Sequence, residues 1–355
     1  MIDWLSFVAP CGHLHALGGP FYAGNVMSFV PDVTRTEGYK VEFDVLKRKS
    51  FEGSYSSTIT VKSQLDENGR SCIFISGNPA KWFQGHNIFG SDDLHGLVIE
   101  MLHRVCKIAG HVPSPNDVLA WQQGVYKLVR VDVTQSFDLG NLARVRNALR
   151  SMDATANLKH RGRGHFVGDS ITFGKGSKRW SLTLYAKGAE IEVKGHKLPL
   201  DLQATQLPIW ANGLLRAEVR MLSLELAKES LQHGFLWGEN TAADVHSRFL
   251  AGLEIAETTM IDSHVFEGLQ GRQQLAYQAW KDGHDLRLTL SRPTFYRYRT
   301  ELLKHGIDIA VKQVRVGPDL SNVVPIRTVL HAYPVSIPDW AFGTPLYFEP
   351  RAQVA

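Results

Sequence analysis

The stretch SLTLYAK, residues 181–187, alternates polar and apolar side chains and therefore predicts a β-strand. Successive side chains of a strand point to opposite faces, so its two leucines face the core. Thr183, Tyr185 and Lys187 then share the other face. A tyrosine and a lysine on one polar face make this strand the starting point for the fold and for a site.

Two other stretches, RVDVT at residues 130–134 and RAEVR at residues 216–220, have the same pattern. Their apolar residues face one way and their charged residues the other. The polar face carries Arg130, Asp132 and Thr134 in the first stretch, and Arg216, Glu218 and Arg220 in the second. If the three strands are neighbours in one sheet, two carboxylates, a tyrosine and several cations share one surface.

Such a surface suits phosphodiester chemistry. Asp132 and Glu218 can hold a Mg²⁺ or Mn²⁺ ion, which polarises a phosphodiester. Arg and Lys can neutralise phosphate oxygens, and a tyrosine oxygen can attack phosphorus and store the cleaved bond as a phosphotyrosine. The alternative interpretation is a solvated sheet face with cross-strand ion pairs.

Two histidine motifs are candidates for a metal site. His86 lies in a loop at residues 77–90 with three glycines and a proline, where it can bind a metal ion or a DNA phosphate. A histidine followed by Asn at such a position can equally make a hydrogen bond at the entry to a helix. The pair His13 and His15 would lie on one strand face and is a second, weaker candidate.

The densest positive cluster is KHRGRGH at residues 159–165, continued by Lys175, Lys178 and Arg179. Flexible basic segments with aromatic neighbours suit single-stranded DNA, so Arg161 and Arg163 are candidate contacts. A solvated loop is the alternative.

A helix over residues 273–281, a turn at Gly283 and a second helix from Ser291 to Gly306 resemble a helix-turn-helix unit near 272–306. Ser is a good helix cap and Pro suits the first turn. The polar side of the second helix carries Arg292, Arg297, Arg299 and Lys304. A plain amphipathic surface helix is the alternative.

The order of predicted elements indicates an α+β fold with an antiparallel sheet and a mostly helical C-terminal part. A chain of 355 residues exceeds the usual domain size, and we expect one domain at 1–225 and a second region at 226–355. Three scattered cysteines fit a reducing compartment. No signal segment or membrane-spanning run is evident, which favours a soluble cytoplasmic protein.

Several motifs resemble the gene II replication initiator family of filamentous phages. They are NPAK at 78–81, QGHNIFG at 84–90 and DL at 93–94, then the stretches at 130–134, 185–187 and 216–220. The resemblance begins at residues 1–3 and returns in FYRY at 295–298, NVVP at 322–325 and PDW at 338–340. The shared order over nearly the whole chain argues against chance agreement.

This resemblance implies a rolling-circle initiator of a phage or related plasmid in a bacterial host. It would nick one strand of its origin, stay linked to the 5′ phosphate through Tyr185, and later rejoin the displaced strand. The host helicase and polymerase would act on the opened origin, which is bound both as duplex and as single strand. A His-hydrophobe-His nuclease pattern is not evident in this family region, where His86 stands, so the metal ligands stay open.

Two other functions remain compatible with the sequence. A non-catalytic origin-binding replication or repressor protein would use the C-terminal helices and the basic loop. A metal-dependent phosphodiesterase would use water in place of Tyr185. A covalent 5′ adduct on DNA distinguishes the nicking enzyme from both.

Overall fold

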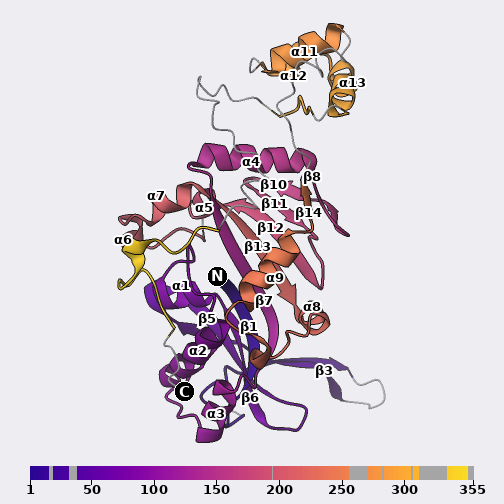
Figure 1. The fold of residues 1–355 in the computed structure, drawn as a ribbon. Coiled ribbons are helices and arrows are strands. Elements are labelled where there is room, and N and C mark those ends of the chain that lie inside the picture. Colours follow the sequence, from indigo (N-terminus) through magenta and orange to yellow (C-terminus); the bar gives the residue numbers. More distant parts are fainter. Residues whose placement is uncertain are drawn as a thin grey trace.

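A nine-stranded antiparallel sheet organises the molecule (Figure 1). The computed structural model describes residues 1–15, 19–31, 38–193, 195–255, 271–281, 284–304, 307–311 and 334–350. The strand order is β10-β11-β12-β13-β7-β1-β6-β5-β4. The strands are β1 (Ile2–Pro10), β4 (Lys49–Glu52), β5 (Thr58–Leu65), β6 (Ser71–Gly77), β7 (Lys127–Asp138), β10 (His165–Val167), β11 (Ser170–Phe173), β12 (Trp180–Ala186) and β13 (Leu214–Leu222).

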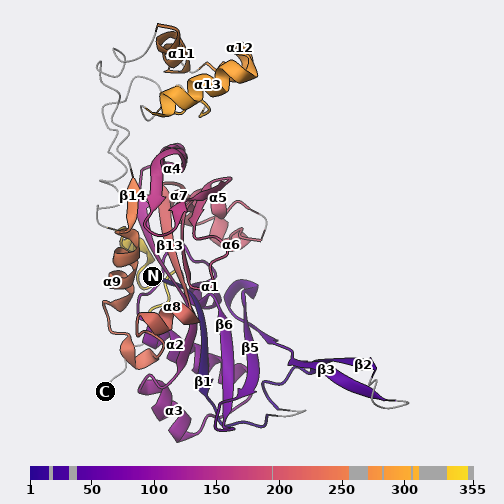
Figure 2. The ribbon, with the colours of Figure 1, turned by 90° about the vertical axis from the view of Figure 1, so that its right-hand side faces the viewer.

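Helices cover the apolar face of this sheet. Val133 and Val219 are buried there, as alternation predicts. They join one hydrophobic core with side chains of α2 (Leu94–Ile108), α4 (Leu142–Thr155) and α9 (Thr241–Leu250). Figure 2 shows α2 and α9 on the same side of the sheet. The other face keeps the polar side chains of the central strands.

The remaining elements are short. The other helices of this part are α1 (Pro79–Gln84), α3 (Pro115–Gln122), α5 (Lys187–Glu190), α6 (Leu200–Gln203), α7 (Leu207–Asn212) and α8 (Ser223–Lys228), with 3₁₀ turns η1 (Ser54–Ser56), η2 (Gly234–Leu236) and η4 (Asp339–Ala341). Strands β8 (Ala156–Leu158), β9 (Gly162–Arg163) and β14 (Leu253–Ile255) form a small sheet. The hairpin of β2 (Asn25–Pro31) and β3 (Tyr39–Leu46) projects from the body (Figure 2).

Three C-terminal helices have a hydrophobic core of their own. They are α11 (Gly271–Lys281), α12 (Leu286–Thr289) and α13 (Arg292–Leu303), with Phe295 and Leu302 buried between them. The sequence predicted the first and last of these but not α12. Ser291 precedes α13 without a side-chain capping hydrogen bond. Gly283, His305, Gly306 and the NVVP motif lie outside the described residues.

The last described segment, residues 334–350, returns to the large sheet. Val335 N donates to Ser136 O at 2.8 Å, and Phe348 N donates to Gln84 Oε1 at 2.8 Å. The predicted α+β class with an antiparallel sheet is confirmed. Within the described ranges, no helix has both the length and the apolar character that crossing a membrane requires.

Candidate active site

The three strands with polar faces are neighbours, a point that the sequence pattern had left as a condition. Strand β13 lies between β12 and β7. In register, Glu218 is opposite Thr183 on β12 and Thr134 on β7. Arg220 is opposite Asp132, and Tyr185 is opposite Arg216. Antiparallel pairing of three alternating strands therefore gathers the predicted acids, the tyrosine and the arginines on one face.

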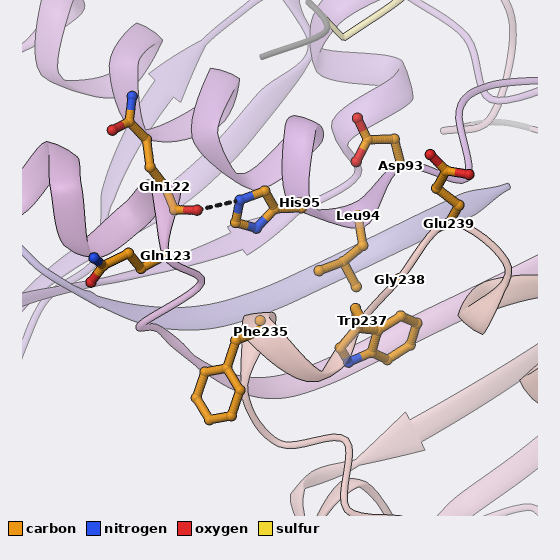
Figure 3. A pocket seen from close by; sticks show the side chains of 10 residues that line it. Asp93, Leu94, His95, Gln122, Gln123, Phe235, Trp237, Gly238 and Glu239 are labelled. Carbon is orange, nitrogen blue, oxygen red and sulfur yellow. Dashed lines mark hydrogen bonds between the residues drawn. The ribbon is translucent and has the colours of Figure 1, made fainter. Parts of the chain in front are cut away.

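A cavity of about 400 Å³ lies away from this face, where α2 begins, α3 ends and η2 turns (Figure 3). His95 Nε2 lies 2.9 Å from Gln122 O there, and its Nδ1 lies 2.9 Å from the Tyr126 hydroxyl. None of the residues predicted from the sequence as a site lines this cavity.

The polar face itself is hollowed by a larger cavity, of about 610 Å³. Of the predicted residues, it is lined by Tyr185, Asp132, Glu218, Arg130 and Arg220. Lys187, His86 and Arg216 do not line it. The structure thus brings together the tyrosine, both predicted carboxylates and two of the arginines.

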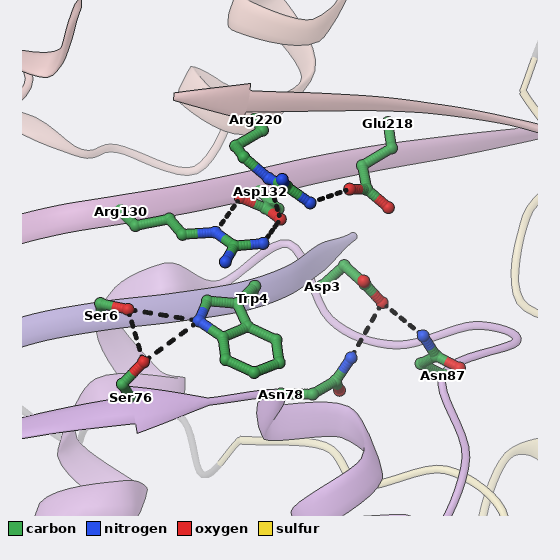
Figure 4. Close-up of polar contacts among 10 residues, drawn as sticks. All are labelled: Asp3, Trp4, Ser6, Ser76, Asn78, Asn87, Arg130, Asp132, Glu218 and Arg220. Carbon is green, nitrogen blue, oxygen red and sulfur yellow. Dashed lines mark hydrogen bonds and ion pairs between the residues drawn. The ribbon is translucent and has the colours of Figure 1, made fainter. Parts of the chain in front are cut away.

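Asp132 is buried and bound by two arginines (Figure 4). Arg130 donates from Nε to Oδ1 at 2.8 Å and makes a second bond to Oδ2. Arg220 donates from Nε to Oδ2 at 3.3 Å. Burial raises the pKa of Asp132, and the charge and hydrogen bonds of Arg130 oppose this.

Glu218 is less well neutralised than Asp132. Arg220 Nη2 lies 3.4 Å from its Oε1. Burial, followed by the negative charges of Asp132 and Asp3, raises the pKa of Glu218 to about 8. A carboxyl group held between two other acids would be stabilised in its ionised form by a cation.

Asp3 is a further acid of the cavity, which the sequence reasoning did not single out. It lies at an irregularity of β1, between Ile2 and Trp4. Its Oδ1 accepts from Asn78 Nδ2 at 3.1 Å and Asn87 Nδ2 at 2.8 Å (Figure 4). The signal available in the sequence was the pair of asparagines in the NPAK and QGHNIFG motifs.

Tyr185 is almost completely buried at the cavity wall. Burial raises its pKa well above the usual 10, and the positive charge of Arg216 opposes this. Expecting Lys187 on the same strand face was wrong, because β12 ends at Ala186 and Lys187 begins α5. The Lys187 ammonium is buried, donates to Asn87 Oδ1 at 2.8 Å and pairs with Glu190. Burial lowers its pKa to about 8.

His86 and Arg216 are buried in structural contacts. His86 Nδ1 accepts from Ile88 N at 3.2 Å, so its Nε2 donates to Leu346 O at 2.8 Å. Burial lowers its pKa to about 4, and both nitrogens are occupied. Arg216 donates to the backbone oxygens of Asn87 and Ile88. Neither side chain is available to a metal ion or a DNA phosphate in this arrangement, contrary to the expectation from the sequence.

His13 and His15 lie past the end of β1 that is far from Asp3. His13 Nε2 and His15 Nδ1 contact Ser63 Oγ at 2.6 and 2.5 Å. Asp3 and Pro10 are seven residues apart along β1, on the order of 20 Å at ~3.3 Å per residue. These histidines therefore belong to a different place from the cavity acids.

The basic residues outside the cavity fall into two groups. Arg161 stacks over the Trp180 ring at 4.6 Å and donates to Ser177 Oγ, while Arg163 is exposed on β9. On α13, Arg292 and Arg297 are exposed. Arg299 instead makes a two-point pair with Asp308, with both N–O distances 2.7 Å.

The cavity acids suit a divalent cation by chemistry, because Asp3, Asp132 and Glu218 supply hard oxygen ligands in one place. Burial is the main cause of the raised pKa of Glu218, and the negative charges of Asp132 and Asp3 add to it. As the side chains stand, no three His, Cys, Asp or Glu residues of the described chain are close enough together to hold a metal ion. Binding a cation here therefore requires side-chain movement, and Arg220, which contacts both Asp132 and Glu218, is a group to displace.

Comparisons with known proteins assign the chain to a family. The N-terminal model of the phage replication-associated gene II proteins matches residues 1–240, and the C-terminal model of the same proteins matches residues 260–347. The replication-associated protein of Enterobacteria phage I2-2 is 37% identical over 345 residues, covering 95% of each chain. The protein of the same name from Enterobacteria phage M13 is 24% identical, covering 81% of this chain and 80% of its own.

Among solved structures, a rolling circle replication initiator protein from Geobacillus stearothermophilus covers 74% of this chain and 88% of its own. It is 10% identical with a TM-score of 0.32, which is too low to carry an inference. The family matches and the 37% identity confirm the resemblance seen in the sequence. This chain belongs to the family of phage replication-associated gene II proteins.

Proposed function

We propose that this protein initiates rolling-circle replication by nicking one strand of a phage or plasmid origin with Tyr185. The observation that supports this most directly is that Tyr185 lines one cavity together with the carboxylates of Asp3, Asp132 and Glu218 and the guanidinium groups of Arg130 and Arg220. Replication is the role that the relatives' names state, and this cavity supplies the groups that a nicking step needs.

In the proposed step, the Tyr185 oxygen attacks phosphorus and the bond from phosphorus to the 3′ oxygen breaks. The products are a 5′-phosphotyrosine and a free 3′ hydroxyl, which the host polymerase extends with the aid of the host helicase. Rejoining reverses the step on the displaced strand. Arg130 and Arg220 at the cavity can neutralise the phosphate oxygens.

Asp132, Glu218 and Asp3 are the residues that would hold a Mg²⁺ or Mn²⁺ ion. When bound, this ion would polarise the phosphodiester and favour the phenolate of Tyr185. The fit rests on the oxygen donors and on the raised pKa of Glu218. His86 is left out of this set, because both of its nitrogens are occupied.

The test is formation of a covalent protein–DNA adduct on a labelled single-stranded oligonucleotide that contains the origin nick site. The wild-type protein should form the adduct and Tyr185→Phe should not, while both bind the DNA. Tyr126→Phe is the matched control, because Tyr126 is as buried as Tyr185 but contacts His95 at the other cavity. Binding without an adduct would favour the non-catalytic origin-binding protein, and cleavage without an adduct would favour a water-using phosphodiesterase.

A further inference from the structure

A carboxylate–imidazole pair lines the same cavity as Tyr185. Glu190 is the last residue of α5, and its Oε1 lies 2.9 Å from His196 Nδ1. Both side chains line the cavity, with 20% of Glu190 and 52% of His196 exposed. Neither residue belongs to the strands that define the polar face.

Glu190 is held in its ionised form. Its Oε2 accepts from the buried Lys187 ammonium, whose positive charge and hydrogen bond outweigh burial and lower the pKa of Glu190 to about 2. Lys187 also donates to Asn87, which donates to Asp3. The Glu190 carboxylate that contacts His196 is thus fixed in charge and position by a chain of hydrogen bonds that ends at Asp3.

This arrangement orients the imidazole. An ionised carboxylate accepts a hydrogen bond from Nδ1–H, which leaves Nε2 as the nitrogen that exchanges a proton. Within the part of the chain that the structure describes, Nε2 of His196 makes no hydrogen bond. The loop is held by His196 N, which donates to Val193 O at 2.9 Å. Lys187 on α5, Lys81 on α1 and Arg216 on β13 are the positive charges that act on Glu190. The same cavity is also lined by Asp3 on β1, Asp169 before β11 and Tyr185 on β12.

The proposed reaction leaves one proton transfer unassigned. When Tyr185 bonds to phosphorus, its own proton goes to solvent and the departing 3′ oxygen must gain one. An imidazole can supply that proton and take it back when the step is reversed. Positioned acid–base catalysis of this kind contributes roughly 10²–10⁴-fold to a rate.

We infer that His196, oriented by Glu190, is the general acid that protonates the leaving 3′ oxygen during nicking. In rejoining it is the general base: the 3′ hydroxyl loses its proton to Nε2, its oxygen attacks phosphorus, and Tyr185 leaves and is reprotonated by solvent. Glu190 is a positioning residue that does not touch the DNA. This assignment rests on the proposed nicking activity of Tyr185.

The test compares two substrates that differ in the leaving atom. One is the normal oligonucleotide, and the other has sulfur in place of the 3′ bridging oxygen, which leaves as a thiolate without needing a proton. His196→Ala should lose about 10²-fold or more in adduct formation on the oxygen substrate and stay within a few-fold of wild type on the sulfur substrate. Tyr185→Phe should form no adduct on either. His103→Ala, an exposed histidine of α2, should match wild type on both.

Glu190→Gln separates orientation from simple packing. The amide keeps a hydrogen-bond acceptor but loses the charge that stabilises a protonated imidazole. In the pH–rate profile of nicking, the alkaline limb should therefore move to lower pH on the oxygen substrate. The profile on the sulfur substrate should not move.

Equal losses of His196→Ala on both substrates, or no loss on either, would overturn the inference. A wild-type protein that forms no adduct on either substrate would instead overturn the nicking activity on which it rests. The melting temperature of His196→Ala is compared with that of wild type, to show that the variant is folded and that its loss of activity is not due to unfolding.

Discussion

Asp132 and Glu218 face one cavity from neighbouring strands and share a single arginine between them. Arg220 Nε lies 3.3 Å from Asp132 Oδ2, and Arg220 Nη2 lies 3.4 Å from Glu218 Oε1. The shared guanidinium contacts both carboxylates and offsets their mutual repulsion. Since the side chain of Arg220 is 43% exposed, it can move away from the two carboxylates when another cation binds them, or when a DNA phosphate attracts it.

Removing either carboxylate should abolish cleavage without abolishing DNA binding. Asp132→Asn and Glu218→Gln keep the shape of each side chain but remove the charge that would hold a divalent cation. We expect a loss of about 10²-fold or more in adduct formation, measured across a Mg²⁺ titration. Asp138→Asn, at the exposed end of the same strand β7, is the control and should behave as wild type. Normal nicking by both variants at low Mg²⁺ would place the metal elsewhere, with His13 and His15 the next residues to test.

The raised pKa of Glu218 should make stability depend on pH. A folded-state pKa of about 8 lies above the unfolded value of 4.5, so the protonated form stabilises the fold. This contribution is complete below about pH 4.5 and is lost as the pH rises towards about 8. The free energy of unfolding should therefore fall over this window, on the order of a few kcal/mol for a shift of this size.

Urea unfolding at about pH 5.5 and about pH 8.5 measures this loss. Glu218→Gln cannot ionise and should show a smaller decrease than wild type between the two conditions. Mg²⁺ should reduce the decrease in wild type but not in the variant, because a bound cation stabilises the ionised carboxyl group. Identical slopes for the two proteins without metal would contradict the raised pKa.

The alternating pattern of the three strands was enough to predict which side chains share the polar face of each strand, but not that the strands are neighbours. Period-two geometry is local, and Tyr185, Asp132 and Glu218 follow from it directly. Asp3 could not be predicted this way, because its partners Asn78 and Asn87 are 75 and 84 residues away. Only the pairing of β1 with β7 and β6 brings it to the cavity.

The errors in the predicted site have local causes. Extending the alternation of residues 181–187 by one residue too many put Lys187 on the strand, whereas the chain turns into α5 at that point. Arg216 has the correct face, but the loop at residues 84–90 folds over it and takes up its donors. Alternation predicts the face of the sheet to which a side chain points. It does not predict which other segment of the chain covers that face.

Arg216 should behave as a structural cation and not as a DNA contact. Arg216→Met leaves two buried backbone oxygens without donors, at about 1–3 kcal/mol each. Urea unfolding should show this destabilisation. The salt dependence of DNA binding by the folded variant should keep the wild-type slope, whereas loss of a phosphate contact would reduce that slope by about one unit. A reduced slope with unchanged stability would restore a direct DNA role for Arg216.

Arg297, an exposed arginine of α13, should act in recognition of duplex DNA, while Arg299 stabilises the helical unit. Arg297 is exposed and its guanidinium lies 5.5 Å from the Tyr298 ring centre, whereas Arg299 is held by Asp308 at two points. Arg297→Ala should therefore reduce nicking of a supercoiled origin more than cleavage of a pre-melted single-stranded origin, because only the former requires duplex binding. Loss of a phosphate contact would lower the salt slope by about one unit, and loss of a base contact would cost about 1–3 kcal/mol and relax specificity at one position. Arg299→Ala should instead lower the melting temperature of the C-terminal helices, and Asp308→Asn should reproduce that effect without removing a positive charge. Equal losses on the two DNA substrates for Arg297→Ala, or none on either, would return α13 to a packed surface helix with no part in recognition.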